Sequence, residues 1–345
     1  MRSDSEPKAN ASAFCRILVP LDGSELAECA LSYVRTLATR LRCRPLLFTA
    51  CTPGDPLEGL YRAYLEKKTD ELRSQGIGAG SELARGDPAS QILDFAERGD
   101  IRLIAISSHG CSGVSRWPLG SIANKVLIKS HIPVLLIRTS GPRTAFEAED
   151  VHRIVGQEVA SLPNEPFRIL VPLDGSPVAQ AIIPHVEALA YGMACEIALL
   201  RVVELVDIPR VGKLGRSFGV TEYEQQWHDL AMRAESEAKS YLGEMESALA
   251  NKGMNVRSAC LVGKPVDTIL RFADDYSADL VALATHGFSG ISRWAFGSVA
   301  SKVVEGSSRP VLLVRPSLPS QMTLSFGMQK ELQRSPSTTD YARTR

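Results

Sequence analysis

The chain carries two copies of one segment, and this duplication limits the possible folds more than any other feature. Residues 16–24 read Arg-Ile-Leu-Val-Pro-Leu-Asp-Gly-Ser and recur unchanged at residues 168–176, an offset of 152. Residues 109–117 recur with two changes at residues 286–294, an offset of 177. The second copy therefore holds 25 more residues than the first between these motifs. We infer one duplicated domain with an insertion in its second copy.

Short apolar runs alternate with segments of helical periodicity in each copy. Residues 17–21 form a run typical of a strand buried on both faces, and apolar residues at helical spacing follow Asp22. A helix expected near residues 57–74 corresponds to a longer one near residues 222–251. Strands that alternate with helices indicate a parallel sheet covered on both faces. We predict an α/β fold of two tandem doubly wound, Rossmann-like domains, each a five-stranded parallel sheet with strand order 3-2-1-4-5.

The repeat also divides the chain into domains and connecting segments. We expect the following division: a disordered N-terminus at 1–13, domain 1 at 14–139, a linker at 140–166, domain 2 at 167–316 with its insertion near 205–235, and a disordered polar tail at 317–345. Each domain would therefore be of ordinary size for a folded unit.

Composition excludes several classes of protein. The chain has 39 basic and 39 acidic residues, and this balance argues against nucleic acid or an anionic membrane as the main partner. Its seven cysteines form no C-x-x-C pair, which favours reduced thiols packed as small apolar groups. No apolar run approaches the roughly 20 residues of a membrane span, and residues 1–12 lack the apolar segment of a secretory signal. We expect a cytoplasmic protein.

Two motifs of each copy lie where ligands of parallel sheets bind, beyond the carboxyl ends of the strands. Asp22 and Asp174 follow the first strand of their copies. The loop after the fourth strand carries two glycines with nine residues between them, and a serine follows the second glycine: Gly110, Gly120 and Ser121 in copy one, Gly287, Gly297 and Ser298 in copy two. A Gly-Ser pair at a helix start presents N–H groups and a hydroxyl to an anion. The sequence thus predicts an anion site in each copy.

These motifs resemble those of the universal stress protein family. Members that bind ATP carry Gly-x-x-Gly, nine residues, and then Gly followed by Ser or Thr, and both copies match all but the first glycine. Ser107 and Ala284 stand at that first position. The Pro-x-Asp-x-Ser setting of the strand-one aspartate and a Gly-x-Pro after the third strand match too.

The resemblance implies roles for individual residues. Gly110, Gly120 and Ser121, with their counterparts Gly287, Gly297 and Ser298, would hold phosphates. Asp22 and Asp174 would lie near the ribose or base, Gly86 and Gly263 would line the pocket, and the adenine edge would meet backbone near Thr49 and Val202. From the residues alone, the aspartates are equally suited to capping the next helix or fixing its turn. No catalytic or metal-ligating residue is indicated.

The resemblance further implies a tandem, UspA-type protein that binds ATP, with or without Mg²⁺, and acts as a stress-response sensor or regulator. The last strands would pair across the domains into an intramolecular pseudo-dimer; a homodimer and a regulatory protein partner are also compatible with the sequence. Two alternatives stay open. One is a slow Mg-dependent ATPase, although the chain has no G-x-x-x-x-G-K-[ST] motif. The other is a nucleotide-free protein-interaction module built on the insertion of the second copy.

Overall fold

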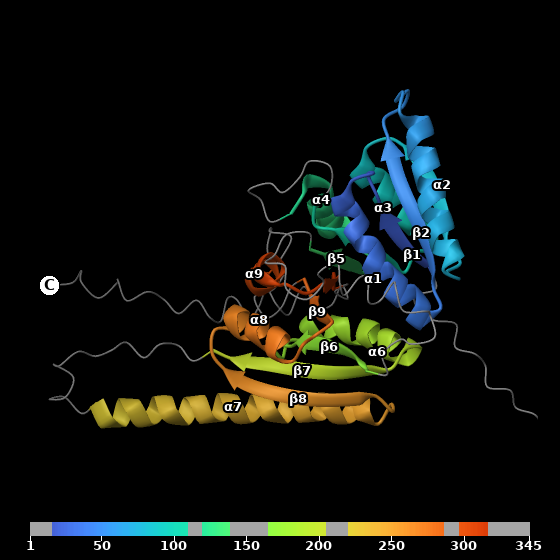
Figure 1. Cartoon of the computed structure of the whole chain (residues 1–345). Coiled ribbons are helices and arrows are strands. Elements are labelled where there is room, and N and C mark those ends of the chain that lie inside the picture. The colour runs from blue at the N-terminus through green and yellow to red at the C-terminus, as the bar shows by residue number, and fades with distance from the viewer. Residues whose placement is uncertain (1–15, 110–118, 139–164, 205–219, 286–296, 317–345) are drawn as a thin grey trace, which may run out of the picture.

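The computed structural model contains two α/β units that are joined into one body (Figure 1). It describes residues 16–109, 119–138, 165–204, 220–285 and 297–316. The expected terminal segments, the linker and most of the loop before the long helix of the second copy therefore lie outside the described residues. No helix among the described residues is long and apolar enough to cross a membrane.

The first repeat alternates strands and helices as its sequence pattern predicts. Its elements are β1 (Arg16–Pro20), α1 (Glu25–Leu41), β2 (Arg44–Cys51), α2 (Glu58–Ser74), β3 (Gly80–Arg85), α3 (Pro88–Arg98), β4 (Leu103–Ser107), α4 (Ser121–Lys129) and β5 (Val134–Ile137). Helix α1 begins where the Ser24 side chain accepts a hydrogen bond from the Ala27 N–H, and it ends at Arg42, whose backbone is left-handed. Its buried residues fall on one face, as expected for a helix packed on a sheet.

The second repeat follows the same order. Its elements are β6 (Phe167–Pro172), the 3₁₀ helix η1 (Ala179–Ile182), α6 (Ile183–Gly192), β7 (Cys195–Val203), α7 (Val220–Ala250), β8 (Asn255–Val262), α8 (Pro265–Asp275), β9 (Leu280–Ala284), α9 (Ser298–Gly306) and β10 (Val311–Val314). Helix α7 has 31 residues, whereas its counterpart α2 has 17. Equivalent residues are offset by 152 through β7 and by 177 from β8 onward, so the extra residues lie between β7 and β8.

The strands form one continuous sheet of ten, in the order β3-β2-β1-β4-β5-β10-β9-β6-β7-β8. Within each repeat the neighbouring strands are parallel and have the predicted order 3-2-1-4-5. The two halves meet where β5 and β10 pair antiparallel, with Leu135 opposite Leu312. The sequence predicts two five-stranded sheets whose last strands associate, and in the structure this association produces a single sheet within one chain.

Two equivalent arginines reinforce the junction symmetrically. Arg138, just after β5, donates from Nη1 to the carbonyl oxygens of Val304, at 2.9 Å, and Glu305 at the end of α9. Arg315, just after β10, donates from Nη1 to the carbonyl oxygen of Ile128 near the end of α4, at 2.9 Å. Each arginine thus satisfies carbonyl groups that the last turn of a helix leaves unpaired. The reciprocity is that of a two-fold interface.

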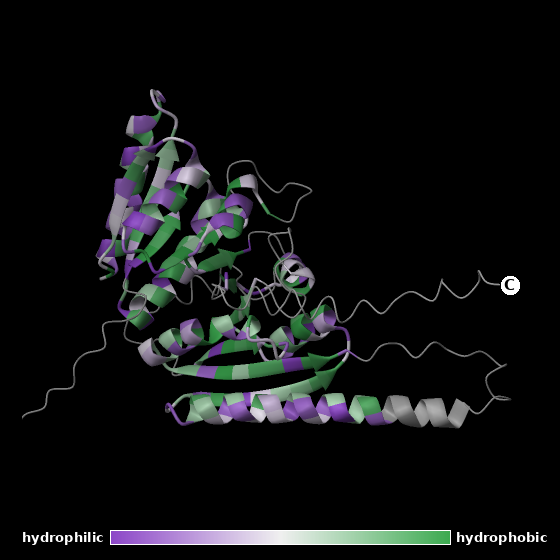
Figure 2. Ribbon diagram, turned by 180° about the vertical axis from the view of Figure 1, so that it is seen from behind, coloured by the Kyte–Doolittle hydropathy of each residue, from purple (hydrophilic) through white to green (hydrophobic). Residues whose placement is uncertain are grey.

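Apolar side chains fill both faces of the sheet. One core cluster lies under α1, α2, α6 and α7, and the other under α3, α4, α8 and α9. Leu47 belongs to the first cluster and Phe48 to the second, because consecutive strand residues point to opposite faces. The strands of both repeats are mainly hydrophobic, whereas α7 mixes hydrophilic and hydrophobic residues from residue 229 onward (Figure 2). Both clusters draw residues from both repeats, so their apolar burial stabilises the halves together.

Candidate functional site

Each repeat has a pocket beyond the carboxyl ends of its first and fourth strands. In the first repeat these strands are β1 and β4, which lie side by side in the sheet, and in the second they are β6 and β9. The chain leaves β1 toward β2 on one side and returns to β4 on the other, so the strand order reverses here. Ligands of open parallel sheets bind at such switch points.

The two pockets are built from the same positions. Their volumes are about 310 Å³ in the first repeat and about 240 Å³ in the second. All fifteen described residues that line the second pocket correspond to lining residues of the first. The second pocket is lined by Pro172, Leu173, Asp174, Ala179, Leu200, Val202, Pro265, Ile269, Leu283, Ala284, Thr285, Gly297, Ser298, Val299 and Ala300. The corresponding residues of the first pocket, in the same order, are Pro20, Leu21, Asp22, Ala27, Phe48, Ala50, Pro88, Ile92, Ile106, Ser107, Ser108, Gly120, Ser121, Ile122 and Ala123. The walls are mostly apolar and carry a few polar groups, as in small-molecule sites generally.

The strand-one aspartate both lines its pocket and organises the turn after the strand. Oδ1 of Asp22 accepts hydrogen bonds from the Ser24 N–H at 3.1 Å and from the Ser24 hydroxyl at 2.6 Å. Asp174 accepts the same pair from Ser176, at 2.9 and 2.6 Å. The glycine between them has a positive φ, +83° at Gly23, which side chains rarely tolerate. The capping role is therefore present in both copies, and it holds the carboxylate at the pocket wall.

The Gly-Ser pair of each copy stands at the start of a helix, on the pocket wall. The Gly120 N–H donates to the Ser108 carbonyl oxygen at 2.8 Å, and the Gly297 N–H donates to the Thr285 carbonyl oxygen at 2.7 Å. These bonds fix the start of α4 and α9 against the preceding strand. Neither helix has a side-chain cap among the described contacts. The first-turn N–H groups are thus placed for an anion.

The residues that replace the expected first glycine also line the pockets. The buried Ser107 hydroxyl donates to the His109 carbonyl oxygen at 2.6 Å, and Ala284 occupies the equivalent position in the second pocket. The Ser108 hydroxyl and the Nδ1 atom of His109 share a hydrogen bond of 3.1 Å. His109 is buried, and this contact fits a loop-stabilising role. Gly110 and Gly287 lie outside the described residues.

Not every residue expected at the site lies on the pocket wall. Val202 lines the second pocket, but Thr49 does not line the first. The strand registers explain the difference, since Pro20 is opposite Phe48 and Pro172 is opposite Leu200. Thr49 is therefore one residue away from the equivalent of Val202. A shift of one residue along a strand changes the face of the sheet to which the side chain points.

The residue that matches Val202 is Ala50, which does line the first pocket. The Thr49 hydroxyl is buried and instead donates to the Leu21 carbonyl oxygen at 2.8 Å. Gly86 and Gly263 are likewise absent from the described linings, where Pro88 and Pro265 represent their motif. Sequence reasoning missed Phe48, Ala50 and the prolines. Aligning the second strands of the two copies residue by residue would have shown the strand positions.

The two sites differ in the side chains that lie near the strand-one aspartate. In the first repeat the Tyr64 hydroxyl donates to Glu28 at 3.0 Å, and Lys68 pairs with Glu28 at 2.8 Å. Burial and the Glu28 charge raise the pKa of Tyr64. In the second repeat Tyr241 instead contacts Gln180 at 3.2 Å, and Arg201 lies over its ring, 5.6 Å from the centroid.

Arg201 takes the position of Thr49 and packs against the turn of the second site. A Cβ atom added to Gly175 would lie 1.8 Å from Nη1 of Arg201, so a larger residue at position 175 would require the guanidinium to move. The second site therefore has the positive charge of Arg201 at the position where the first site has the hydroxyl of Thr49. Within the described residues, Asp22 and Asp174 are the carboxylates that line the pockets, and no cluster of three or more His, Cys, Asp or Glu could hold a metal ion.

Comparison with known proteins identifies relatives of both halves. A sequence model described as "Universal stress protein family" matches residues 13–138 and 167–315. Universal stress protein MJ0577 of Methanocaldococcus jannaschii is 29% identical over 155 residues, which cover 43% of this chain and 94% of the relative. Universal stress protein Rv2005c of Mycobacterium tuberculosis is 23% identical over 260 residues, which cover 72% of this chain and 74% of the relative. The crystal structure of a universal stress protein from Archaeoglobus fulgidus covers 88% of this chain and 99% of its own, with a TM-score of 0.58 and 19% identity, and shows the same fold.

Proposed function

The chain belongs to the universal stress protein family, and from that premise we propose that each of its two pockets binds ATP and that the protein acts as a stress-linked sensor or regulator. The observation that carries this proposal is the equivalence of the pockets. Fifteen lining positions coincide, including the strand-one aspartate and the Gly-Ser helix start. A pocket present twice in one chain, with mostly apolar walls and a few polar groups, suits a ligand with both a charged and an aromatic part.

We propose one orientation for the nucleotide, based on the chemistry of the pocket walls. The phosphates take the helix start at Gly120 and Ser121, where N–H groups, a hydroxyl and the helix dipole favour an anion. The ribose hydroxyls donate to Asp22, and the adenine lies among apolar residues such as Ala50 and Ile92. The second pocket holds its nucleotide in the same way, through Gly297, Ser298 and Asp174.

Magnesium would enter with the phosphates and not through a cage of protein ligands. Mg²⁺ in nucleotide sites keeps several waters and uses one or two carboxylates, and each described pocket wall offers one. Hydrolysis needs a group that activates water in addition. His109 is engaged with the Ser108 hydroxyl, and the described wall holds no second carboxylate. A binding and signalling role therefore accounts for the site better than rapid turnover.

The test is a calorimetric titration of ATP with Mg²⁺ into the nucleotide-stripped full chain, with a stoichiometry near two expected. Ser121→Glu and Ser298→Glu each place a negative charge where the phosphates bind, and an acidic residue is well tolerated in the first turn of a helix. Each variant should remove one binding event, and the double variant should remove both. Ser121→Gln and Ser298→Gln, which add the same bulk without charge, are the matched controls and should lose less affinity.

Two outcomes would overturn the proposal. One is the absence of binding at millimolar ATP, which would favour a nucleotide-free interaction module. The exposed Leu230 and Met232 of α7, 56% and 55% accessible, would then be the surface to examine. The other is an unchanged stoichiometry in the double glutamate variant, which would place ATP elsewhere on the molecule. Phosphate release above background, lost in Asp22→Ala with Asp174→Ala, would instead make the protein a slow ATPase.

A further inference from the structure

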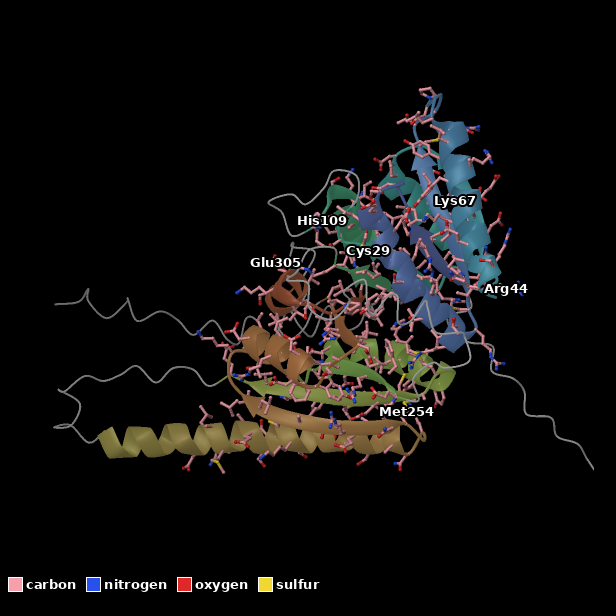
Figure 3. The ribbon with its side chains drawn as sticks, viewed as in Figure 1. Cys29, Arg44, Lys67, His109, Met254 and Glu305 are labelled. Atoms are coloured by element: carbon pink, nitrogen blue, oxygen red, sulfur yellow. The ribbon has the colours of Figure 1, made fainter. Side chains whose placement is uncertain are left out.

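A second kind of pocket lies at the opposite edge of the first repeat, where the strands begin. Its volume is about 690 Å³, and its lining includes Arg16, Arg42, Arg44, Gly78 and Gly80. Arg16 and Arg44 are the first residues of the adjacent strands β1 and β2 and lie opposite each other in register. In Figure 3 Arg44 and His109 lie far apart, at opposite ends of the first repeat. This pocket is therefore separate from the proposed nucleotide site.

The described residues that line this pocket include three arginines and no Asp or Glu. Arg16 donates from Nη1 to the Gly99 carbonyl oxygen at 2.8 Å, and this acceptor carries no charge that would neutralise the guanidinium. Arg42 and Arg44 are exposed, and no ion pair joins any of the three to a carboxylate in the part of the chain that the structure describes. Three like charges on one concave surface repel one another and attract an anion.

The equivalent position in the second repeat is neutralised and filled. Its counterparts of Arg42 and Arg44 are Ala194 and Glu196, and the counterpart of Gly80 is Arg257. Nε of Arg257 pairs with Oε1 of Glu196 at 3.1 Å. The Arg257 guanidinium also lies over the ring of Tyr276, 4.3 Å from its centroid.

The first repeat reverses each of these features. Three glycines of the first repeat take the positions of larger residues in the second: Gly78 stands for Asn255, Gly80 for Arg257 and Gly99 for Tyr276. Arg44 stands at the position where the second repeat has Glu196. The open space and the unpaired charges therefore occur together at one copy of a duplicated edge, and they are not a general property of the fold.

We propose that this edge of the first repeat is a binding site for a small anion that carries more than one phosphate charge. Guanidinium groups match phosphate oxygens in geometry and form charge-assisted hydrogen bonds with them. Glycine at positions 78 and 80 lets such a ligand approach the backbone, since these two residues carry no side chain of their own. The volume of about 690 Å³ is within the usual range for small-molecule sites.

The second repeat supplies the variant that tests this site. Arg44→Glu combined with Gly80→Arg builds the Glu196–Arg257 ion pair into the first repeat, and so closes the pocket with residues that its own duplicate tolerates. The pair of changes lowers the net charge by one. Arg62→Ala makes the same change in net charge on the exposed face of α2, where Arg62 pairs with Glu58, and is the matched control.

The measurement is a calorimetric titration of inorganic pyrophosphate into the full chain, with hydrogen exchange of residues 78–80 to locate the ligand. The paired variant should weaken binding by at least about tenfold, since it removes one charge-assisted partner and fills the space. Arg62→Ala should bind like the unmodified chain. Ser121→Glu with Ser298→Glu, which blocks the phosphate positions proposed for the nucleotide pockets, should keep the binding event that hydrogen exchange locates at residues 78–80. Arg42→Ala is a second, milder variant that keeps the test valid if the paired variant does not fold.

Three results would overturn the proposal. The first is no pyrophosphate binding by the unmodified chain at millimolar concentration. The second is equal affinity in the paired variant, in Arg42→Ala and in the control. The third is binding of an acidic peptide, sensitive to Arg42→Ala, by a chain that does not bind pyrophosphate, which would make the edge a protein-docking surface.

Discussion

Ser24 and Ser176 show how one side chain serves both folding and the site. The Ser24 hydroxyl donates to Asp22 at 2.6 Å and accepts the Ala27 N–H at 3.1 Å, so it caps α1 and orients the carboxylate. We predict that Ser24→Ala lowers the free energy of unfolding by about 1 kcal/mol, the usual effect of losing such a cap. Urea denaturation measures it.

The control for this prediction is Ser74→Ala at the end of α2. Its hydroxyl is exposed and donates to the Glu71 carbonyl oxygen at 2.8 Å, so its loss should change stability by less than about 0.5 kcal/mol. ATP affinity should also fall in Ser24→Ala, because Asp22 loses a partner that fixes its position. Equal stability of the two variants would contradict the capping role.

The carboxyl group of Asp279 makes the stability of the folded state depend on pH. Burial raises its pKa above the ordinary 3.8, although the Arg168 N–H, at 2.8 Å, and the charges of Arg40 and Arg309 oppose the shift. The folded state therefore keeps a proton that the unfolded chain has already released. This stabilisation of the folded state is complete when the pH is below the pKa that Asp279 has in the unfolded chain. It is lost as the pH rises through the higher pKa that Asp279 has in the folded state.

Asp279→Asn removes that dependence and keeps an oxygen that can accept the Arg168 N–H. We predict that the variant gains stability relative to the unmodified chain as pH rises from below 3.8 to neutral. Urea midpoints at several pH values measure the difference. A variant that instead loses stability steadily over this range would show that the arginine charges outweigh burial.

The residue-level prediction from sequence succeeded where a motif is local. The Asp-Gly-Ser turn forms within three residues, so its hydrogen bonds follow from the residue types and their spacing. Thr49 shows the opposite case. The face of the sheet to which a strand residue points depends on how its strand pairs with the neighbouring strand. The sequence prediction names Thr49, whereas the residue that lines the pocket is its neighbour Ala50. Arg201 beside Gly175 could not be predicted for the same reason.

At the scale of elements, the junction of β5 and β10 depends on the two reciprocal arginines. Each donates to the last turn of a helix in the other repeat. We predict that Arg138→Ala or Arg315→Ala lowers the free energy of unfolding by about 1 kcal/mol, because a charged donor is lost from a partly exposed site. The two effects should add within about 0.5 kcal/mol, since the described hydrogen bonds of the two arginines go to different helices.

Arg98→Ala is the control for the junction variants. Arg98 is exposed and donates to the Asp94 carbonyl oxygen within its own helix, at 3.1 Å, so its removal should leave the association of the repeats unchanged. Chemical denaturation of the single and double variants gives the comparison. If Arg138→Ala is no more destabilising than Arg98→Ala, the bonds across the junction contribute nothing measurable.

The order of elements and the place of the insertion could be predicted because they depend on the chain alone. The change of offset from 152 to 177 located the extra residues, and α7 extends over residues expected to be helical. The arginine-lined edge was not foreseen. Arg44 meets Gly78 and Gly80 only because β2 and β3 are neighbours in the sheet, and the register of this pairing is not visible in the sequence.

At the scale of the whole molecule, the continuous sheet makes the two repeats one structural unit. Leu135 of the first repeat and Leu312 of the second are paired in register and buried in the same core cluster. Arg138 and Arg315 join the helices across the same line. A repeat that unfolded alone would expose this apolar surface on its partner, at a cost proportional to the area uncovered.

We therefore predict one cooperative unfolding transition for the whole chain, although it contains two domains, which often unfold separately. Leu72 and Leu249 are equivalent, almost fully buried residues of α2 and α7. Leu72→Ala and Leu249→Ala should each remove about 2–5 kcal/mol of stability. Because the halves unfold together, each variant should move the whole calorimetric peak to lower temperature. A scan of Leu72→Ala that splits into two peaks, one unmoved, would show that each repeat unfolds independently and that the shared sheet couples them only weakly.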